Sequence, residues 1–108
     1  MTWTVETLNA AVDAELEALP ASLKARMARI VELIEAVGLE HVREPHVAHL
    51  EDKLWEIRAK AKDGIARAIY ITVAGKRVLI LHVFVKKTQK TPLRALELAR
   101  RRMREVTA

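Results

Sequence analysis

Residues 54–85 read LWEIRAKAKDGIARAIYITVAGKRVLILHVFV, and this stretch decides the fold. Its apolar residues alternate with polar ones in three runs, at Leu54–Ala59, Ile65–Val73 and Arg77–Val85. A period of two is typical of β-strands, and the segments KDG and AG between the runs are typical of tight turns. The stretch therefore predicts an antiparallel meander of three strands.

The residues before the meander have a helical period instead. Apolar residues recur every three or four positions across 8–19, and again across 20–38. Pro20 suits the first turn of the second helix and Gly38 suits its end. We therefore expect two helices in antiparallel contact.

The remaining segments complete one α+β domain over residues 1–108, which is too short a chain for two domains. Trp3–Val5 is a candidate opening strand, and Leu39–Lys53 has no clear period, so it predicts a loop with room for one turn of helix. Pro92–Val106 has the pattern of a basic amphipathic helix. We expect the helices to pack on one face of a small antiparallel sheet, with the basic helix last in the chain.

The composition excludes several classes of function. The chain has no cysteine, which excludes a disulfide framework and thiolate chemistry. It has one serine, Ser22, and no glycine-rich phosphate loop, so a serine hydrolase or a nucleotide-binding motif is disfavoured. No run reaches the roughly 18 apolar residues of a membrane span, and the N-terminus does not resemble a signal peptide. We expect a soluble, cytoplasmic protein with no membrane partner.

The charge is distributed unevenly along the chain. Residues 1–52 hold four Lys and Arg against ten Asp and Glu, a net charge of −6. Residues 53–108 hold fifteen against four, a net charge of +11, which leaves +5 overall. A concentrated positive field favours nucleic acid as a partner, and an acidic protein segment is the second candidate.

The third run of the meander is followed by a cluster of lysines in HVFVKKTQKTP, residues 82–92. Alternation puts His82, Phe84 and Lys86 on one face of that strand, and Leu81, Val83 and Val85 on the other. In the first run, Arg58 shares a face with Glu56, while Trp55 and Ile57 face the helices.

If the strands are neighbours in chain order, Arg58, His82, Phe84 and Lys86 line one surface with Lys87 and Lys90 at its rim. Cations bind phosphate and an aromatic ring stacks on a base, so the surface suits single-stranded RNA. The alternative is structural: Phe84 fills core, His82 is a surface imidazole and Arg58 pairs with Glu56 or Glu51.

Two further sets of residues are ambiguous. Arg67 is in phase with Ile69 and Ile71, so it is expected to point inward, where it needs a carboxylate partner or an anion. Three histidines lie in the predicted loop, but their spacing matches no familiar zinc pattern and we predict no metal site. They are His41, His46 and His49.

The segments KLWEIR, GIARAIY and HVFVKKTQKTP, followed by a basic helix, resemble the RelE/HigB-type toxins of type II toxin–antitoxin systems, in their phage-derived branch. The resemblance covers residues 54–105 in motif detail and the whole chain in element order. It implies a RelE-like domain that cuts ribosome-bound mRNA with no metal or other cofactor. It also implies an inhibitory antitoxin, typically a helix-turn-helix protein, so that any contact with DNA is indirect.

By motif position, the resemblance implies a catalytic set of Arg58, Arg67, Lys86 and Lys87. The reaction is attack of the ribose 2′-hydroxyl on phosphorus, in which arginine stabilises the developing charge. The chain lacks a tyrosine near the last strand, a residue that some relatives use, so Lys86, Lys87 and His82 all remain candidates for the base. We assign RNA binding to Lys53, His82, Phe84, Lys90 and Arg94.

Two alternatives stay open at the level of sequence. Related ParE-type toxins inhibit DNA gyrase without cleaving RNA, and a plain nucleic-acid-binding module would need no catalysis. An RNase needs Arg58, Arg67 and the lysines gathered in one place, whereas an inhibitor does not.

Overall fold

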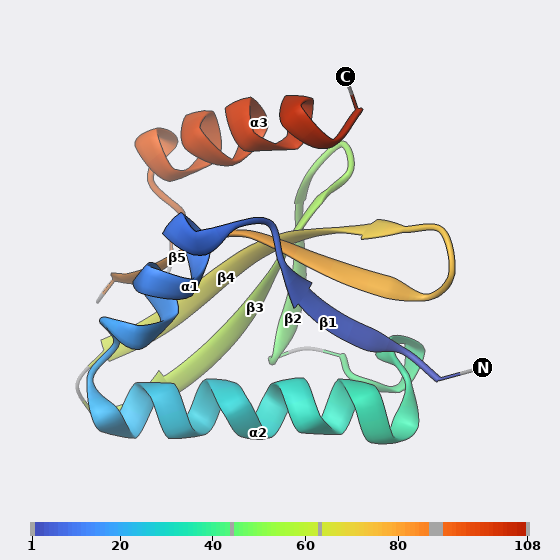
Figure 1. Ribbon diagram of the computed structural model, residues 1–108. Helices are drawn as coiled ribbons and strands as arrows, with labels where there is room; N and C mark the ends of the chain where they lie inside the picture. Colours follow the sequence, from blue (N-terminus) through green and yellow to red (C-terminus); the bar gives the residue numbers. More distant parts are fainter. Residues whose placement is uncertain (1, 44, 63, 87–89, 108) are drawn as a thin grey trace.

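The structure, a computed structural model, describes residues 2–43, 45–62, 64–86 and 90–107 (Figure 1). Its elements in chain order are β1 (Thr4–Thr7), α1 (Ala10–Glu17), α2 (Ala21–Val37), a 3-10 turn (Leu39–His41), β2 (Val47–Glu51), β3 (Leu54–Ala61), β4 (Gly64–Val73), β5 (Arg77–Lys86) and α3 (Leu93–Thr107). The predicted meander and all three predicted helices are present. The fold is α+β, as predicted.

The two N-terminal helices begin and end where the sequence supplies the right residues. The Asn9 side chain caps α1 by accepting a hydrogen bond from the Val12 amide at 3.2 Å. Pro20 precedes α2, and Gly38 ends it with a φ of 95°, a conformation that an L side chain rarely adopts.

The sheet has five strands in the order β1-β5-β4-β3-β2. Strands β3 to β5 pair in antiparallel fashion, as predicted; β2 also pairs antiparallel with β3, and β1 pairs in parallel with β5. The sheet is therefore mixed, which corrects the prediction of an antiparallel sheet. A parallel pair needs a long crossover, and here the whole chain from α1 to β4 supplies it.

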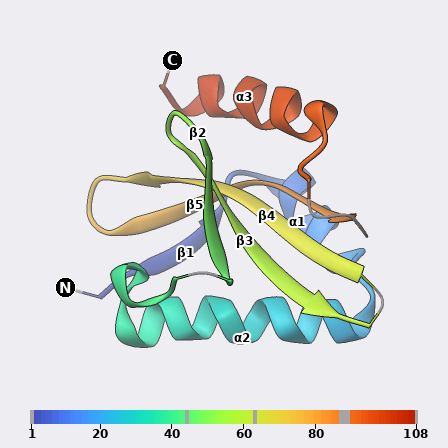
Figure 2. The same ribbon diagram turned by 180° about the vertical axis from the view of Figure 1, so that it is seen from behind.

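The predicted loop Leu39–Lys53 contains an edge strand, β2, that the sequence did not reveal (Figure 2). The strand has five residues and a register shift between His49 and Glu51, so it is too short and too irregular to show a clean alternation. Pairing with β3 stabilises it.

The helices cover both faces of the sheet, which corrects the prediction that they share one face. Helix α2 lies against one face and α3 against the other (Figures 1 and 2). One core cluster joins Leu23 and Met27 of α2 to Ile57 of β3, and a separate cluster joins Ala95 and Ala99 of α3 to residues of β4 and β5. Polar residues of the α3 face therefore lie partly under a helix.

A bulge in β5 changes the predicted assignment of faces. Ile69 is opposite His82 whereas Tyr70 is opposite Ile80, so Leu81 is an extra residue in β5. Leu81 packs in the cluster under α3, while Val83 packs in the cluster under α2. The prediction that these two share a face is wrong because strict alternation fails at a bulge.

Within the described part of the chain, no helix is both long enough and apolar enough to cross a membrane.

Candidate functional site

Arg58, Arg67 and Phe84 form a row, here called the arginine row, across the face of the sheet on the α3 side. Arg58 of β3 is directly opposite Arg67 of β4, which is directly opposite Phe84 of β5. Side chains directly opposite one another lie on the same face about 4.5–5.5 Å apart at their Cβ atoms. The structure therefore brings together three of the residues that the sequence predicted to share a site.

The carboxylate of Glu56 holds this row in place. It accepts hydrogen bonds from Nε of Arg58 at 2.6 Å, from a terminal nitrogen of Arg67 at 2.9 Å and from Oγ1 of Thr91 at 2.8 Å. Glu56 and Arg67 are both fully buried. The inward orientation predicted for Arg67, and its need for a carboxylate, are confirmed.

Arg58 differs from Arg67 in its exposure. The side chain of Arg58 is 29% exposed. Among the described residues its guanidinium makes one hydrogen bond, from Nε to Glu56. An arginine carries five N–H donors in a fork that matches the oxygens of phosphate. The terminal nitrogens of Arg58 are therefore available for an anion, while Glu56 fixes the direction of the guanidinium.

Lys86 lies one step further along the same face. It is opposite Ile65, which is opposite Lys60, so this second row adds two ammonium groups beside the arginines. Neither lysine pairs with a carboxylate among the described residues. Lys87, also predicted to be catalytic, lies outside the described residues.

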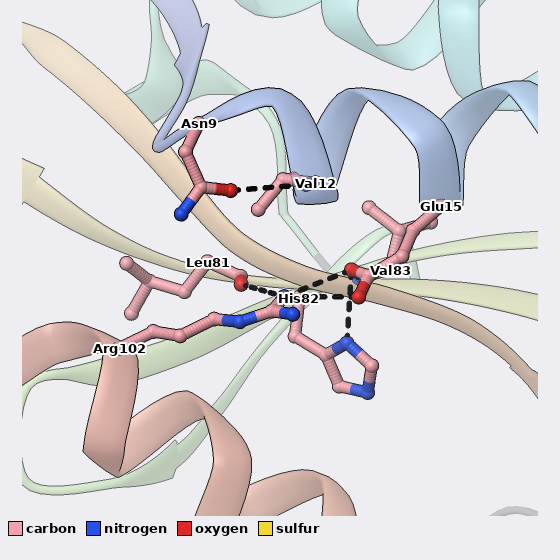
Figure 3. Close-up of polar contacts among 7 residues, drawn as sticks. All are labelled: Asn9, Val12, Glu15, Leu81, His82, Val83 and Arg102. Carbon is pink, nitrogen blue, oxygen red and sulfur yellow. Dashed lines mark hydrogen bonds and ion pairs between the residues drawn. The ribbon is translucent and has the colours of Figure 1, made fainter.

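On the other side of the arginine row lies His82, held by residues from two helices (Figure 3). Its Nδ1 atom is 3.0 Å from Oε1 of Glu15 in α1, and Arg102 of α3 donates to the same carboxylate at 3.0 Å. Burial alone would raise the pKa of Glu15, but hydrogen bonds from Val83 and His82 and the nearby cations hold that pKa below its usual range. Glu15 is therefore ionised at neutral pH.

Phe84 has two roles. It packs against the core cluster under α3, as the structural alternative expected. Its ring also stacks on His82, with the centroids 5.0 Å apart and the planes at 21°. Because Phe84 is only partly buried, its ring remains a candidate surface for a nucleobase.

The remaining predicted RNA-binding residues are at different distances from the arginine row. Lys90 and Arg94 are exposed, and they flank Thr91, which bonds to Glu56. Lys53 is exposed at the turn before β3, five positions from Arg58, so a rise of about 3.3 Å per residue puts it about 16 Å along the strand. The structure brings Lys90 and Arg94 to the rim and leaves Lys53 outside it.

A cavity of about 730 Å³ opens on the α2 side of the sheet. Three of the four aromatic residues of the chain line it, namely Trp3, Trp55 and Tyr70. Trp55 is 40% exposed there, less covered by the helices than alternation predicted, and burial raises the pKa of Tyr70. None of the predicted site residues lines this cavity.

One loop histidine has a clear structural partner, since His49 packs its ring on Trp55 with the centroids 4.7 Å apart. Among the described residues there is no group of three or more His, Asp or Glu side chains placed to hold a metal ion.

The sequence did not identify three residues of the site: Glu15, Thr91 and Arg102. Glu15 follows Val12 by three positions on the apolar side of α1, which is a weak sign that it faces the sheet. No local sequence pattern indicated that Thr91 and Arg102 belong to the site, because their partners are distant in sequence.

Taken together, the α3 face presents a fixed guanidinium, two ammonium groups, an imidazole and a partly exposed aromatic ring, with one central carboxylate. A surplus of cations around a rigid row is suited to bind a phosphodiester and to stabilise extra negative charge on it. An imidazole nitrogen can accept or donate a proton in a reaction of that phosphodiester.

Residues 14–104 match the family described as phage-derived protein Gp49-like. None of the curated proteins is significantly similar to the chain in sequence.

Two solved structures have a similar fold. One is the archaeal RelE–RelB complex from Pyrococcus horikoshii, at 26% identity and a TM-score of 0.59, covering 83% of this chain and 100% of that one. The other is a free-state mutant of the E. coli toxin RelE, at 12% identity and a TM-score of 0.66, covering 95% of this chain and 99% of that one. The domain described above therefore has a RelE-like fold.

Proposed function

Because the chain belongs to the Gp49-like family of phage-derived proteins, we propose that it is the toxin of a toxin–antitoxin module and acts as a ribosome-dependent endoribonuclease. The RelE-like fold, which the chain shares with the E. coli toxin RelE, supports the toxin assignment. The observation that carries the RNase assignment is the row of Arg58, Arg67 and Phe84, with the terminal nitrogens of Arg58 open to an anion.

The mechanism is attack of a ribose 2′-hydroxyl on the adjacent phosphorus, without a metal. Arg58 binds the non-bridging phosphate oxygens, and its charge stabilises the pentavalent species that forms. Arg67 does not reach solvent, so it acts through Glu56 and through the positive potential beneath the phosphate. Lys86 adds a point charge and Lys90 extends the basic surface along the RNA. For Lys87 we propose a catalytic role from its motif position alone.

The ribosome supplies what a shallow surface lacks. Cleavage requires the 2′-oxygen, the phosphorus and the leaving 5′-oxygen in line. Holding the atoms in this orientation lowers the activation barrier by several kcal/mol. A small basic patch binds the phosphate but does not impose that angle on free RNA. We therefore expect slow cleavage without ribosomes.

The partner that controls the activity is an antitoxin, in accord with the similar fold of the archaeal RelE–RelB complex. The surface it covers is the arginine row together with the exposed cations of α3, namely Arg94, Arg101 and Arg104. An acidic segment steered by this field associates rapidly and blocks access to RNA. The antitoxin is a helix-turn-helix protein, through which the complex contacts DNA, and both act in the cytoplasm.

Mapping of mRNA 5′ ends after brief expression tests the proposal. The expected result is a set of new ends in frame with codons in translated regions, present with the natural chain and absent with Arg58→Ala. Lys53→Ala is the matched control, since it removes a cation outside the site. Growth arrest without new ends would favour a ParE-like gyrase inhibitor, and neither arrest nor cleavage would favour a plain nucleic-acid-binding module.

A further inference from the structure

Glu15 joins three parts of the fold through one carboxylate (Figure 3). Beyond Ile80, β5 has no pairing with β1, so the outer edge of β5 needs other partners. The Val83 amide donates to Oε1 of Glu15 at 3.0 Å, and Nδ1 of His82 lies 3.0 Å from the same oxygen. Arg102 bridges Glu15 to the carbonyl of Leu81, which it reaches at 2.8 Å.

This geometry determines which nitrogen of His82 carries the proton. An ionised carboxylate only accepts hydrogen bonds, and Glu15 is ionised at neutral pH because its pKa is lowered. The short contact with Glu15 therefore requires that Nδ1 is the donor. In a neutral imidazole the other nitrogen, Nε2, then carries the free lone pair.

His82 lies on the same sheet face as the row of Arg58, Arg67 and Phe84, and its Nε2 atom is open. Figure 3 shows Nε2 directed away from Glu15, and no described residue makes a hydrogen bond to it. His82 shares its face with Arg67 and Phe84, and as a diagonal neighbour it is about 7–8 Å from Arg67 across the strands. The stacked ring of Phe84 restricts rotation of the imidazole. Nε2 is thus an oriented base beside a phosphate-binding row.

We propose that Glu15 is a positioning residue, which holds His82 as the Nδ1–H tautomer so that Nε2 accepts the proton of the attacking 2′-hydroxyl. The proposal rests on the RNase function proposed above. The 2′-oxygen forms a bond to phosphorus as its proton passes to Nε2, and the bond from phosphorus to the 5′-oxygen breaks. The leaving oxygen takes a proton from the Lys86 ammonium or from water, which gives a 2′,3′-cyclic phosphate and a 5′-hydroxyl.

The alternative role for Glu15 is purely structural, as a tether between α1, β5 and α3. The two roles predict different effects of mutation on His82. Both must take account of the charged groups that face its ring. These are Glu15 from α1, Arg102 from α3 and Arg67 from β4, with Glu56 beyond Ile69 on β3. Removing the carboxylate of Glu15 takes away the acceptor of Nδ1, whereas removing Arg102 leaves that acceptor in place. A pure tether predicts no such difference between the two variants.

Nitrogen-15 NMR of the purified chain tests the tautomer without any assay of activity. In the natural chain the neutral ring of His82 is expected to carry its hydrogen on Nδ1. Glu15→Leu removes the acceptor at similar volume, and hydrogen on Nε2 is then expected to appear. Arg102→Met keeps the contact between Glu15 and His82, so the Nδ1–H tautomer should persist. A ring with hydrogen on Nε2 in the natural chain would overturn the proposal.

The rate of mRNA cleavage on programmed ribosomes, measured against pH, tests the consequence. Glu15→Leu should lower the rate about 10²-fold, as loss of an oriented base does. Glu15→Gln keeps an oxygen for the Val83 amide and for Nδ1 of His82, so it should retain part of the rate. Arg102→Met leaves Glu15 in place, so it should retain more of the rate than Glu15→Leu.

The results separate the two proposals. If the natural chain cleaves no mRNA, the proposed function fails, and the NMR result then decides alone whether Glu15 sets the tautomer. If the natural chain cleaves mRNA and a folded Glu15→Leu variant has the same rate and pH profile, the positioning role is excluded. Equal losses of rate in Glu15→Leu and Arg102→Met, with the Nδ1–H tautomer unchanged in both, would show a tether only.

Discussion

Arg67 and Glu56 form an ion pair 2.9 Å long, and neither side chain is exposed to solvent. The pair joins the two central strands of the candidate site, and Glu56 also holds Arg58. Breaking a buried pair from one side leaves a charge without its partner in a medium of low dielectric. The position of the arginine row and the stability of the domain therefore depend on the same contact.

Arg67→Ala is expected to destabilise the domain by about 3–5 kcal/mol, because it leaves the buried Glu56 carboxylate poorly compensated. Urea unfolding followed by circular dichroism measures the change. Arg58→Ala is the control: its side chain is partly exposed, water can replace its contact, and a loss of about 1 kcal/mol is expected. Equal urea midpoints for Arg67→Ala and the natural chain would show that the pair does not stabilise the fold.

A double-mutant cycle between Arg67→Ala and Glu56→Ala isolates the pair itself. The sum of the two single losses in free energy of unfolding should exceed the loss in the double variant. The difference, which is the coupling energy, should be about 0.5–3 kcal/mol. Additive losses in the urea experiment would mean that Arg67 is stabilised by packing rather than by Glu56.

Arg58→Ala and Lys86→Ala are each expected to lower the rate of ribosome-dependent cleavage about 10²–10³-fold, as loss of one preorganised group does in other enzymes. Single-turnover cleavage on programmed ribosomes measures the rate. Lys53→Ala removes a similar charge about 16 Å away along β3, and it should leave the rate within a few-fold of the natural value. A large loss in Lys53→Ala would extend the RNA-binding surface beyond the site described here.

The stability of the domain is expected to fall below about pH 4.5, the ordinary pKa of a glutamate. The folded-state pKa of Glu15 is lowered, so its contribution is fully present above the unfolded-state pKa and is lost as the pH falls through the folded value. Thermal unfolding between pH 3 and pH 7 measures the dependence. Glu15→Gln should have a shallower acid limb, and an unchanged limb would mean that Glu15 contributes no pH-dependent stability.

The elements with strong periodicity were predictable from sequence. The alternation of apolar residues predicted the type and approximate bounds of β4 and β5. The residues that flank α2 did the same for that helix. The edge strand β2 and the parallel β1 were harder, because short edge strands take their conformation from pairing with distant neighbours rather than from their own pattern.

The candidate site was predictable as far as alternation reached. Residues on one face of neighbouring strands, such as Arg58, Arg67 and Phe84, could be grouped once the strands were assumed to be adjacent. The contact between Glu15 and His82 spans 67 positions and depends on how α1 packs beside a bulged strand. No local pattern encodes such a contact.

Binding to single-stranded RNA in the absence of ribosomes is expected to be weak and strongly dependent on salt. Each phosphate neutralised should contribute about −0.7 to the slope of log K against log salt concentration, so contacts at Arg58, Lys86 and Lys90 predict a slope near −2. Fluorescence anisotropy of a labelled oligonucleotide measures it. Arg58→Ala should make the slope shallower by about 0.7, whereas Lys53→Ala should leave it unchanged. If both variants change the slope equally, RNA follows the general charge of the surface and the arginine row has no privileged role.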